Sequence, residues 1–187
     1  MSRDVIPFYL ALAMLCGAAI ALDALLHMFG MVWFGRYLGI PGVMLIIASS
    51  GYSMRKRKLI SSGKPVSLLR WHERLAWVGS LLILVHAGIH FNAILAWLAV
   101  GAMLINVASG LTGKFLLGRA RRRLDATRAG LLAEGFSSEV VEERTHWDSL
   151  TLDAVKKWRV IHLPITLAFA VLALAHIISV FLFWGWK

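Results

Sequence analysis

The sequence predicts an all-α protein: an integral membrane helical bundle of five transmembrane helices, forming a single domain over residues 1–187. Three observations predict this fold. The chain is 59% hydrophobic with a mean hydropathy of +0.72, more apolar than the roughly half that is usual in soluble domains. Its apolar residues fall in long blocks. Its Lys and Arg residues are concentrated in two of the segments that separate these blocks.

Each of the five apolar segments is long enough to cross a bilayer, which takes about 20 helical residues. We expect them at residues 5–28, 33–53, 68–91, 93–117 and 158–184. The first carries Asp23 and is too long for the apolar core of a signal peptide. Gly30 and Asn92 mark turns between segments. Pro41 and Pro164 lie near segment entrances, where a missing N–H does least harm.

The distribution of basic residues predicts the orientation. The linker 54–70 holds six Lys or Arg residues and no acid, and the stretch 114–159 holds ten Lys or Arg residues. The positive-inside rule therefore puts both stretches and the N-terminus in the cytoplasm and the C-terminus in the periplasm. We expect a multi-pass protein of the bacterial cytoplasmic (inner) membrane, in contact with membrane lipid.

The cytoplasmic loop at about 114–157 is the only sizeable polar segment. It alternates charged residues with Leu, Val and Phe, which predicts short surface helices that are either solvated or dock a partner. It has no Gly-rich phosphate loop and is too short for a flavin or nicotinamide domain. The pI near 10.5 follows from basic topology signals, so we expect no nucleic acid partner. The single cysteine, Cys16, allows no intrachain disulfide, and the chain lacks the motif for c-type haem.

Four histidines lie at matched positions in two apolar segments: His72 and His86 in the third, His162 and His176 in the fifth. Both pairs are 14 residues apart, which in a helix is an advance of about 21 Å and a turn within about 40° of a whole number. Both helices run in the same direction, so His72 should lie level with His162 and His86 with His176. Neutral imidazole is a common axial ligand of haem iron. The pattern predicts two haem b groups, with these four histidines as the metal ligands.

Other interpretations of the same residues stay open. A membrane histidine can form hydrogen bonds across helices, and His86 with His90 could hold a metal on one helix face, leaving the other three histidines unexplained. Gly79, midway between His72 and His86, would admit either a macrocycle edge or a neighbouring helix. Phe169, the midpoint of the fifth segment, would either fill the gap between the haems or face lipid.

Polar residues near the histidines suggest further contacts. At least one cation within about a turn of the basic-side histidines is expected to bind a haem propionate; the candidates are Arg70, Arg74, Lys157 and Arg159, which are equally explained as topology anchors. His90 is expected to border an outer-side site for a quinone headgroup or a propionate. Asp23 and His27 lie at that level, where they would relay protons to a quinone or form structural hydrogen bonds.

The segments "WHERLAWVGSLLILVHAGIH" and "WRVIHLPITLAFAVLALAHI" resemble respiratory cytochrome b and the ferric reductase-like transmembrane family, which includes the haem subunit of the bacterial methionine sulfoxide reductase system. The resemblance covers under half of the chain and implies haem b ligation by the four paired histidines. The chain departs from both patterns. It has no Pro-Glu-Trp-Tyr quinol-oxidation motif, and it has five expected spans and no flavin module where ferric reductases usually have six spans and one.

The predicted function is transmembrane electron transfer by a dihaem b-type cytochrome subunit of an oxidoreductase complex. No catalytic residue is expected, because the redox chemistry belongs to the cofactors. Electrons would pass between a quinone or redox partner on one side and a partner subunit or soluble electron carrier on the other. The alternatives are a histidine-lined metal or solute transporter and a structural membrane anchor for a catalytic subunit.

Overall fold

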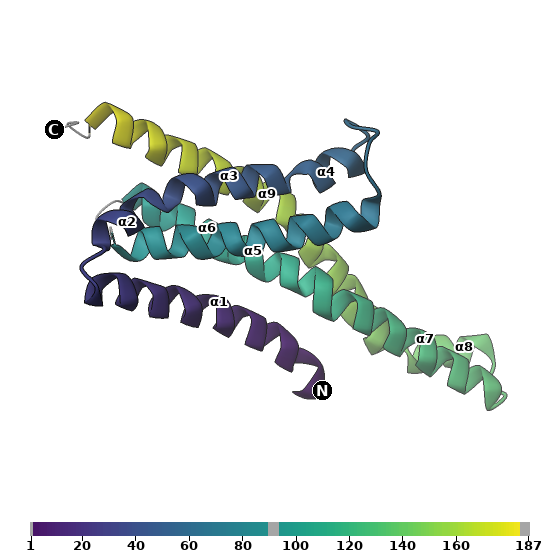
Figure 1. The fold of residues 1–187 in the computed structure, drawn as a ribbon. Helices are drawn as coiled ribbons and strands as arrows, with labels where there is room; N and C mark the ends of the chain where they lie inside the picture. The colour runs from purple at the N-terminus through teal and green to yellow at the C-terminus, as the bar shows by residue number, and fades with distance from the viewer. Residues whose placement is uncertain (1, 90–93, 184–187) are drawn as a thin grey trace.

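The computed structural model describes residues 2–89 and 94–183, and this part of the chain is helical with no strand. The helices follow one another as an antiparallel bundle (Figure 1). They are α1 (Ser2–Met28), α2 (Val32–Tyr37), α3 (Gly39–Ser49), α4 (Gly51–Lys56), α5 (Pro65–Ile89), α6 (Ile94–Leu111), the π-helix η1 (Thr112–Leu117), α7 (Gly118–Ala133), α8 (Ser138–Arg144) and α9 (His146–Phe183).

Four helical segments of the described chain are long and apolar enough to cross a membrane: Val5–Met28, Val32–Lys56, Ile94–Ala133 and His146–Phe183. Most of their side chains point outward, as lipid-facing residues do. The all-helical membrane fold is therefore confirmed. Helix α5 has 25 residues, but charged residues and histidines make it less apolar than these four. Its role as a fifth span stays a prediction.

The second span is not one continuous helix but three short ones, α2, α3 and α4. Pro41 accounts for the first break, because it has no N–H for the carbonyl of Tyr37 and its ring crowds that carbonyl. Helix α2 accordingly ends at Tyr37. The second break falls at Ser50, between the end of α3 at Ser49 and the start of α4 at Gly51.

Two pairs of helices pack closely, α3 along α5 and α6 along α9, while α1 flanks α5. Within the described residues α5 and α9 share no comparable backbone packing, so they face one another across a wider gap. Side chains from four helices meet halfway along the bundle. This core consists of Ile83, Ala99, Met103 and Phe169, with Val43 and Ile46 of α3 packed against it. Phe169 is 6% exposed and thus fills the middle of the bundle.

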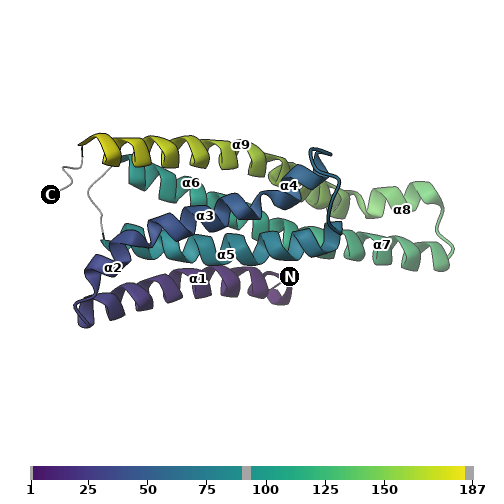
Figure 2. The ribbon, with the colours of Figure 1, turned by 45° about the horizontal axis from the view of Figure 1, so that its top comes forward.

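The basic loop does not form separate short helices lying on the bundle. Instead α6, η1 and α7 run on as one 40-residue helical segment, and α9 already begins at His146. We call the end of the bundle where α4 ends and α5 begins the basic end. Figure 2 shows α7 and α8 projecting beyond this end. The stretch 119–133 is rich in Arg, Leu and Ala, which favour helix, so the helix continues until Gly135, whose φ of 85° suits a helix end. Only α8 is a short helix of the expected kind.

Candidate functional site

The structure brings the four matched histidines together as two pairs, one from α5 and one from α9 in each case. The ring centroids of His72 and His162 lie 6.5 Å apart, and those of His86 and His176 also lie 6.5 Å apart. We call these the basic-end pair and the far pair. Within each pair the rings are steeply inclined to each other, at 83° and 62°. The two pairs are separated along the bundle by the core around Phe169.

The separation within each pair fits a metal ion held between two imidazoles. Bonds of about 2 Å from the metal to each nitrogen put two opposed nitrogens about 4 Å apart and the ring centroids about 6 Å apart. The observed 6.5 Å is close to this value in both pairs. Helices α5 and α9 themselves do not pack closely along their backbones, so the rings of each pair face one another across the space between these two helices.

The second span fixes the orientation of the α5 histidines. His72 Nδ1 lies 2.9 Å from the carbonyl oxygen of Ser49, at the break between α3 and α4. Because a carbonyl can only accept, Nδ1 carries the proton and Nε2 keeps the lone pair that a metal needs. His86 lies against the start of α3, where an added Cβ at Gly39 would lie 2.9 Å from its Cδ2. Each break in the span thus adjoins one histidine of α5.

The α9 histidines have buried nitrogens that need partners. Nδ1 of His162 and Nδ1 of His176 are buried without a hydrogen bond to any described residue. Burial of an unpaired polar atom is unfavourable, and imidazole can bind a metal through either nitrogen. Around His162, the hydroxyl of Thr166 lies 2.6 Å from the His162 carbonyl oxygen and 3.0 Å from Oδ1 of Asn106. The chemistry of the donors therefore fits a bound metal at both levels.

Three residues that adjoin the pairs were not expected from the sequence. The ring of Tyr52 lies 5.9 Å from that of His72, and Lys56 is close enough to His162 for their charges to interact. Both are on α4, one turn apart and hence on one face. An added Cβ at Gly39 would lie only 2.9 Å from Cδ2 of His86, so α3 approaches that ring as closely as a glycine allows. The only sequence signal was the four-residue spacing of Tyr52 and Lys56, which has no meaning until α4 is known to lie beside α5.

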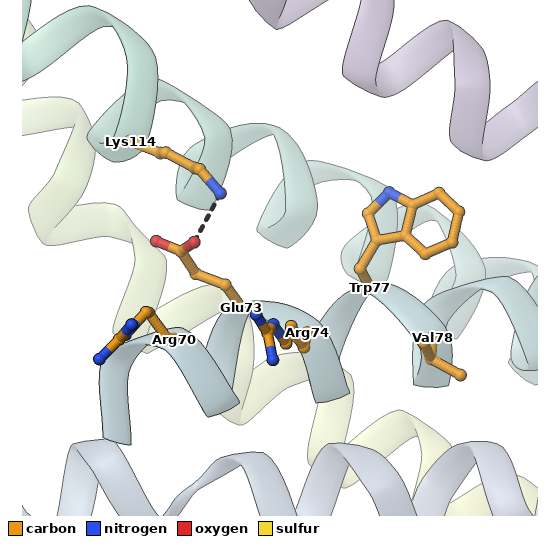
Figure 3. A pocket seen from close by; sticks show the side chains of 6 residues that line it. All are labelled: Arg70, Glu73, Arg74, Trp77, Val78 and Lys114. Carbon is orange, nitrogen blue, oxygen red and sulfur yellow. Dashed lines mark hydrogen bonds and ion pairs between the residues drawn. The ribbon is translucent and has the colours of Figure 1, made fainter. Parts of the chain in front are cut away.

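The structure does not bring Arg70 and Arg74 to the basic-end pair. Each is two residues from His72, about 200° around the helix, and therefore on the opposite side of α5. Both line an open groove instead, together with Glu73, Trp77, Val78 and Lys114 (Figure 3). Lys157 is exposed, whereas the side chain of Arg159 and the whole of His90 lie outside the described residues. Lys56 is a described cation whose charge interacts with His162, and the propionate contact stays a prediction.

Gly79 belongs to the contact between α5 and α3. An added Cβ there would lie 2.9 Å from the carbonyl oxygen of Gly42, and one at Gly42 would lie 3.1 Å from the carbonyl oxygen of Gly79. Of the two roles expected for Gly79, the structure shows the close approach of a neighbouring helix. This contact holds α3 against α5 between the levels of the two histidine pairs.

A carboxylate and a histidine lie together at the far end of α1. His27 Nδ1 lies 2.9 Å from the backbone oxygen of Asp23 and 3.6 Å from its Oδ1. The Asp23 carboxylate packs against α5 at Gly88, where an added Cβ would lie 3.1 Å from Cγ of Asp23. The hydrogen bond lies within α1, and the buried Oδ1 of Asp23 has no hydrogen-bond partner among the described residues, so both expected roles of this pair stay predictions.

Within residues 2–89 and 94–183 no group of three or more His, Cys, Asp or Glu side chains is placed to hold a metal ion. No protein-family model, curated protein or solved structure matches this chain. The resemblance to cytochrome b therefore stays a prediction.

Proposed function

We propose that this chain is a membrane cytochrome b that relays electrons between the two sides of a bilayer. The observation that carries the proposal is the occurrence of two histidine pairs with the same 6.5 Å separation at two levels of one bundle. Each pair would hold one haem b, giving the four ligands His72, His86, His162 and His176. A haem iron bound in this way supplies a reversible one-electron couple.

The chain's own residues would hold the ligands and keep water out. The Ser49 carbonyl fixes the tautomer of His72, and Gly39 of the second span packs against the ring of His86. The pairs are about 21 Å apart along each helix, so they would lie in opposite halves of a hydrocarbon core about 30 Å thick. The apolar core around Phe169 lies between the two levels.

The same proposal makes α5 a fifth membrane span. Its ends would carry Arg70 and Arg74 at the cytoplasmic surface and His90 at the outer surface, where polar groups are tolerated. The basic residues at the basic end support a cytoplasmic location for that end in a bacterial inner membrane. Electrons would reach and leave the pairs through a quinone, a partner subunit or a soluble carrier.

The arrangement favours electron transfer over the two alternatives. A transporter needs a polar path through the midplane, usually at broken helices. Here α3 is continuous at mid-level, and the apolar side chains of Ile83, Met103 and Phe169 pack together there. A purely structural anchor would not need paired histidines at two depths, each of which is unfavourable in lipid without a ligand or partner.

The decisive experiment is to measure the haem content of the purified protein and of single histidine variants. We expect about two b haems per chain by pyridine haemochrome assay, with a low-spin spectrum. His72→Ala and His162→Ala should remove one haem, and His86→Ala and His176→Ala the other. His146→Ala is the matched control, because that exposed histidine contacts Trp147 and lies outside both pairs.

Three outcomes would contradict the proposal: no haem, a c-type haem, or loss of the same haem in His72→Ala and His176→Ala. Redox titration of each single-haem variant identifies which haem remains, because two haems in different surroundings differ in potential. Metal binding without haem would support the transporter.

A further inference from the structure

The groove at the basic end of α5 is the strongest feature outside the histidine pairs. It has a volume of about 450 Å³ and is lined by Arg70, Glu73, Arg74, Trp77, Val78 and Lys114. A smaller hollow of about 200 Å³ adjoins it and shares both arginines, with Ser67 and Trp71 as its other walls. The two arginines therefore form a ridge that is open on both sides.

The charges in this groove do not balance. Lys114 of η1 forms an ion pair with Glu73, which neutralises both (Figure 3). Arg70 and Arg74 are exposed, and neither has an ion-pair partner among the residues that the structure describes. Two uncompensated guanidinium groups one helical turn apart remain, and guanidinium binds phosphate oxygens through paired hydrogen bonds.

The polarity of the groove changes along α5 in the direction of the bilayer. Arg70, Arg74 and Val78 follow one another at four-residue spacing, so they form one stripe with steps of about 6 Å. Trp77, on the adjoining stripe, also lines the inner part of the groove. Val78 is 42% exposed and open to a ligand from the lipid side. The groove thus offers cations at its outer end and apolar side chains at its inner end.

We propose that this groove binds the phosphate of an anionic phospholipid, with the start of an acyl chain lying against Val78 and Trp77. A soluble anion would use the arginines but gain nothing from the apolar inner end. A zwitterionic lipid carries its own cation, which the two arginines would repel. The local change from α-helix to π-helix at Thr112–Leu117 places Lys114 on the groove, where its ion pair holds Glu73 away from the phosphate position. This proposal does not depend on haem binding.

Native mass spectrometry of the full chain in detergent tests the proposal, with phosphatidylglycerol and phosphatidylcholine added at equal concentration. We expect phosphatidylglycerol to be retained preferentially. The preference should fall at least about tenfold in the double variant Arg70→Gln/Arg74→Gln, which keeps most of the packing surface but removes both charges. The matched control is Arg121→Gln/Arg122→Gln on α7, which removes the same charge from exposed positions away from the groove. A circular dichroism spectrum of each variant checks that it is folded.

Three outcomes would overturn the proposal. Equal retention of both lipids by the unaltered chain would show no preference for an anionic headgroup. Equal loss in the two double variants would show general charge attraction rather than a site. Displacement of phosphatidylglycerol by inorganic phosphate at millimolar concentration would show that the groove takes a free anion. A Val78→Asp variant adds an independent test, because it should weaken lipid retention while leaving both arginines in place.

Discussion

Replacing Gly39 by alanine should perturb the far histidine pair without touching either histidine. Gly39 is the first residue of α3 and packs against the ring of His86. A Cβ at this position would lie 2.9 Å from Cδ2, 3.0 Å from Cγ and 3.1 Å from Nε2 of that ring. The ring must therefore retreat, or α3 must move away from α5.

The required displacement is large compared with the tolerance of a metal site. Ordinary contact for a Cβ begins at 3.4 Å, so the ring must move by about 0.5 Å from the 2.9 Å contact. Bonds between metals and protein ligands hold to within about 0.2 Å. Changes that misplace a ligand through its surroundings typically weaken metal binding by about 10–100-fold, and we expect an effect of that size on the far haem. The basic-end haem should remain.

Haem content after size-exclusion chromatography, followed by redox titration, measures this effect. The control is Gly51→Ala in the same span, because an added Cβ at Gly51 meets nothing within 4 Å. Alanine also favours helix over glycine by up to about 1 kcal/mol, so the control should be neutral or stabilising. If Gly39→Ala and Gly51→Ala bind two haems with the same potentials, the inferred contact between Gly39 and a ligating His86 is wrong.

Two further predictions concern the surroundings of the pairs. His90→Ala should keep both haems and the low-spin spectrum, since His86 already pairs with His176. The variant should slow electron exchange with an added quinone or shift one haem potential. Loss of a whole haem would identify His90 as the ligand. The orientation is tested with Ser137→Cys in a chain that also carries Cys16→Ser. The new cysteine should react with a membrane-impermeant maleimide only after the cells are opened. Labelling in intact spheroplasts would contradict the proposed orientation.

The helical spans and the level matching of the histidines follow from sequence because they depend on local regularities. Helix length is fixed by the rise per residue, and a spacing of 14 residues repeats the same helix face whatever the neighbours are. Two helices separated by one intervening span also run in the same direction. These three facts predict that His72 lies level with His162, which is where the structure places it.

The contacts around the histidines could not be predicted in this way, because they depend on which helix faces which. Arg70 and Arg74 are near His72 in sequence but lie on the other side of α5, while Lys56 is 16 positions earlier and lies near the basic-end pair. The breaks in the second span were equally hidden. Pro41 signals a missing hydrogen bond, but its position relative to His86 depends on how α2 and α3 pack against α5.

Helices α3 and α6, which carry none of the four paired histidines, determine how far apart the histidine rings of each pair lie. Helices α3 and α6 pack closely against α5 and α9 respectively, and an added Cβ at Gly79 would lie 2.9 Å from the carbonyl oxygen of Gly42. This packing leaves α5 and α9 opposed but not touching along their backbones. Direct packing of α5 on α9 would force the rings of each pair closer than two bonds to a shared metal allow. The helices that lack paired histidines therefore set the distance on which the proposed function depends, and a variant such as Gly39→Ala in α3 should weaken haem binding without removing a ligand.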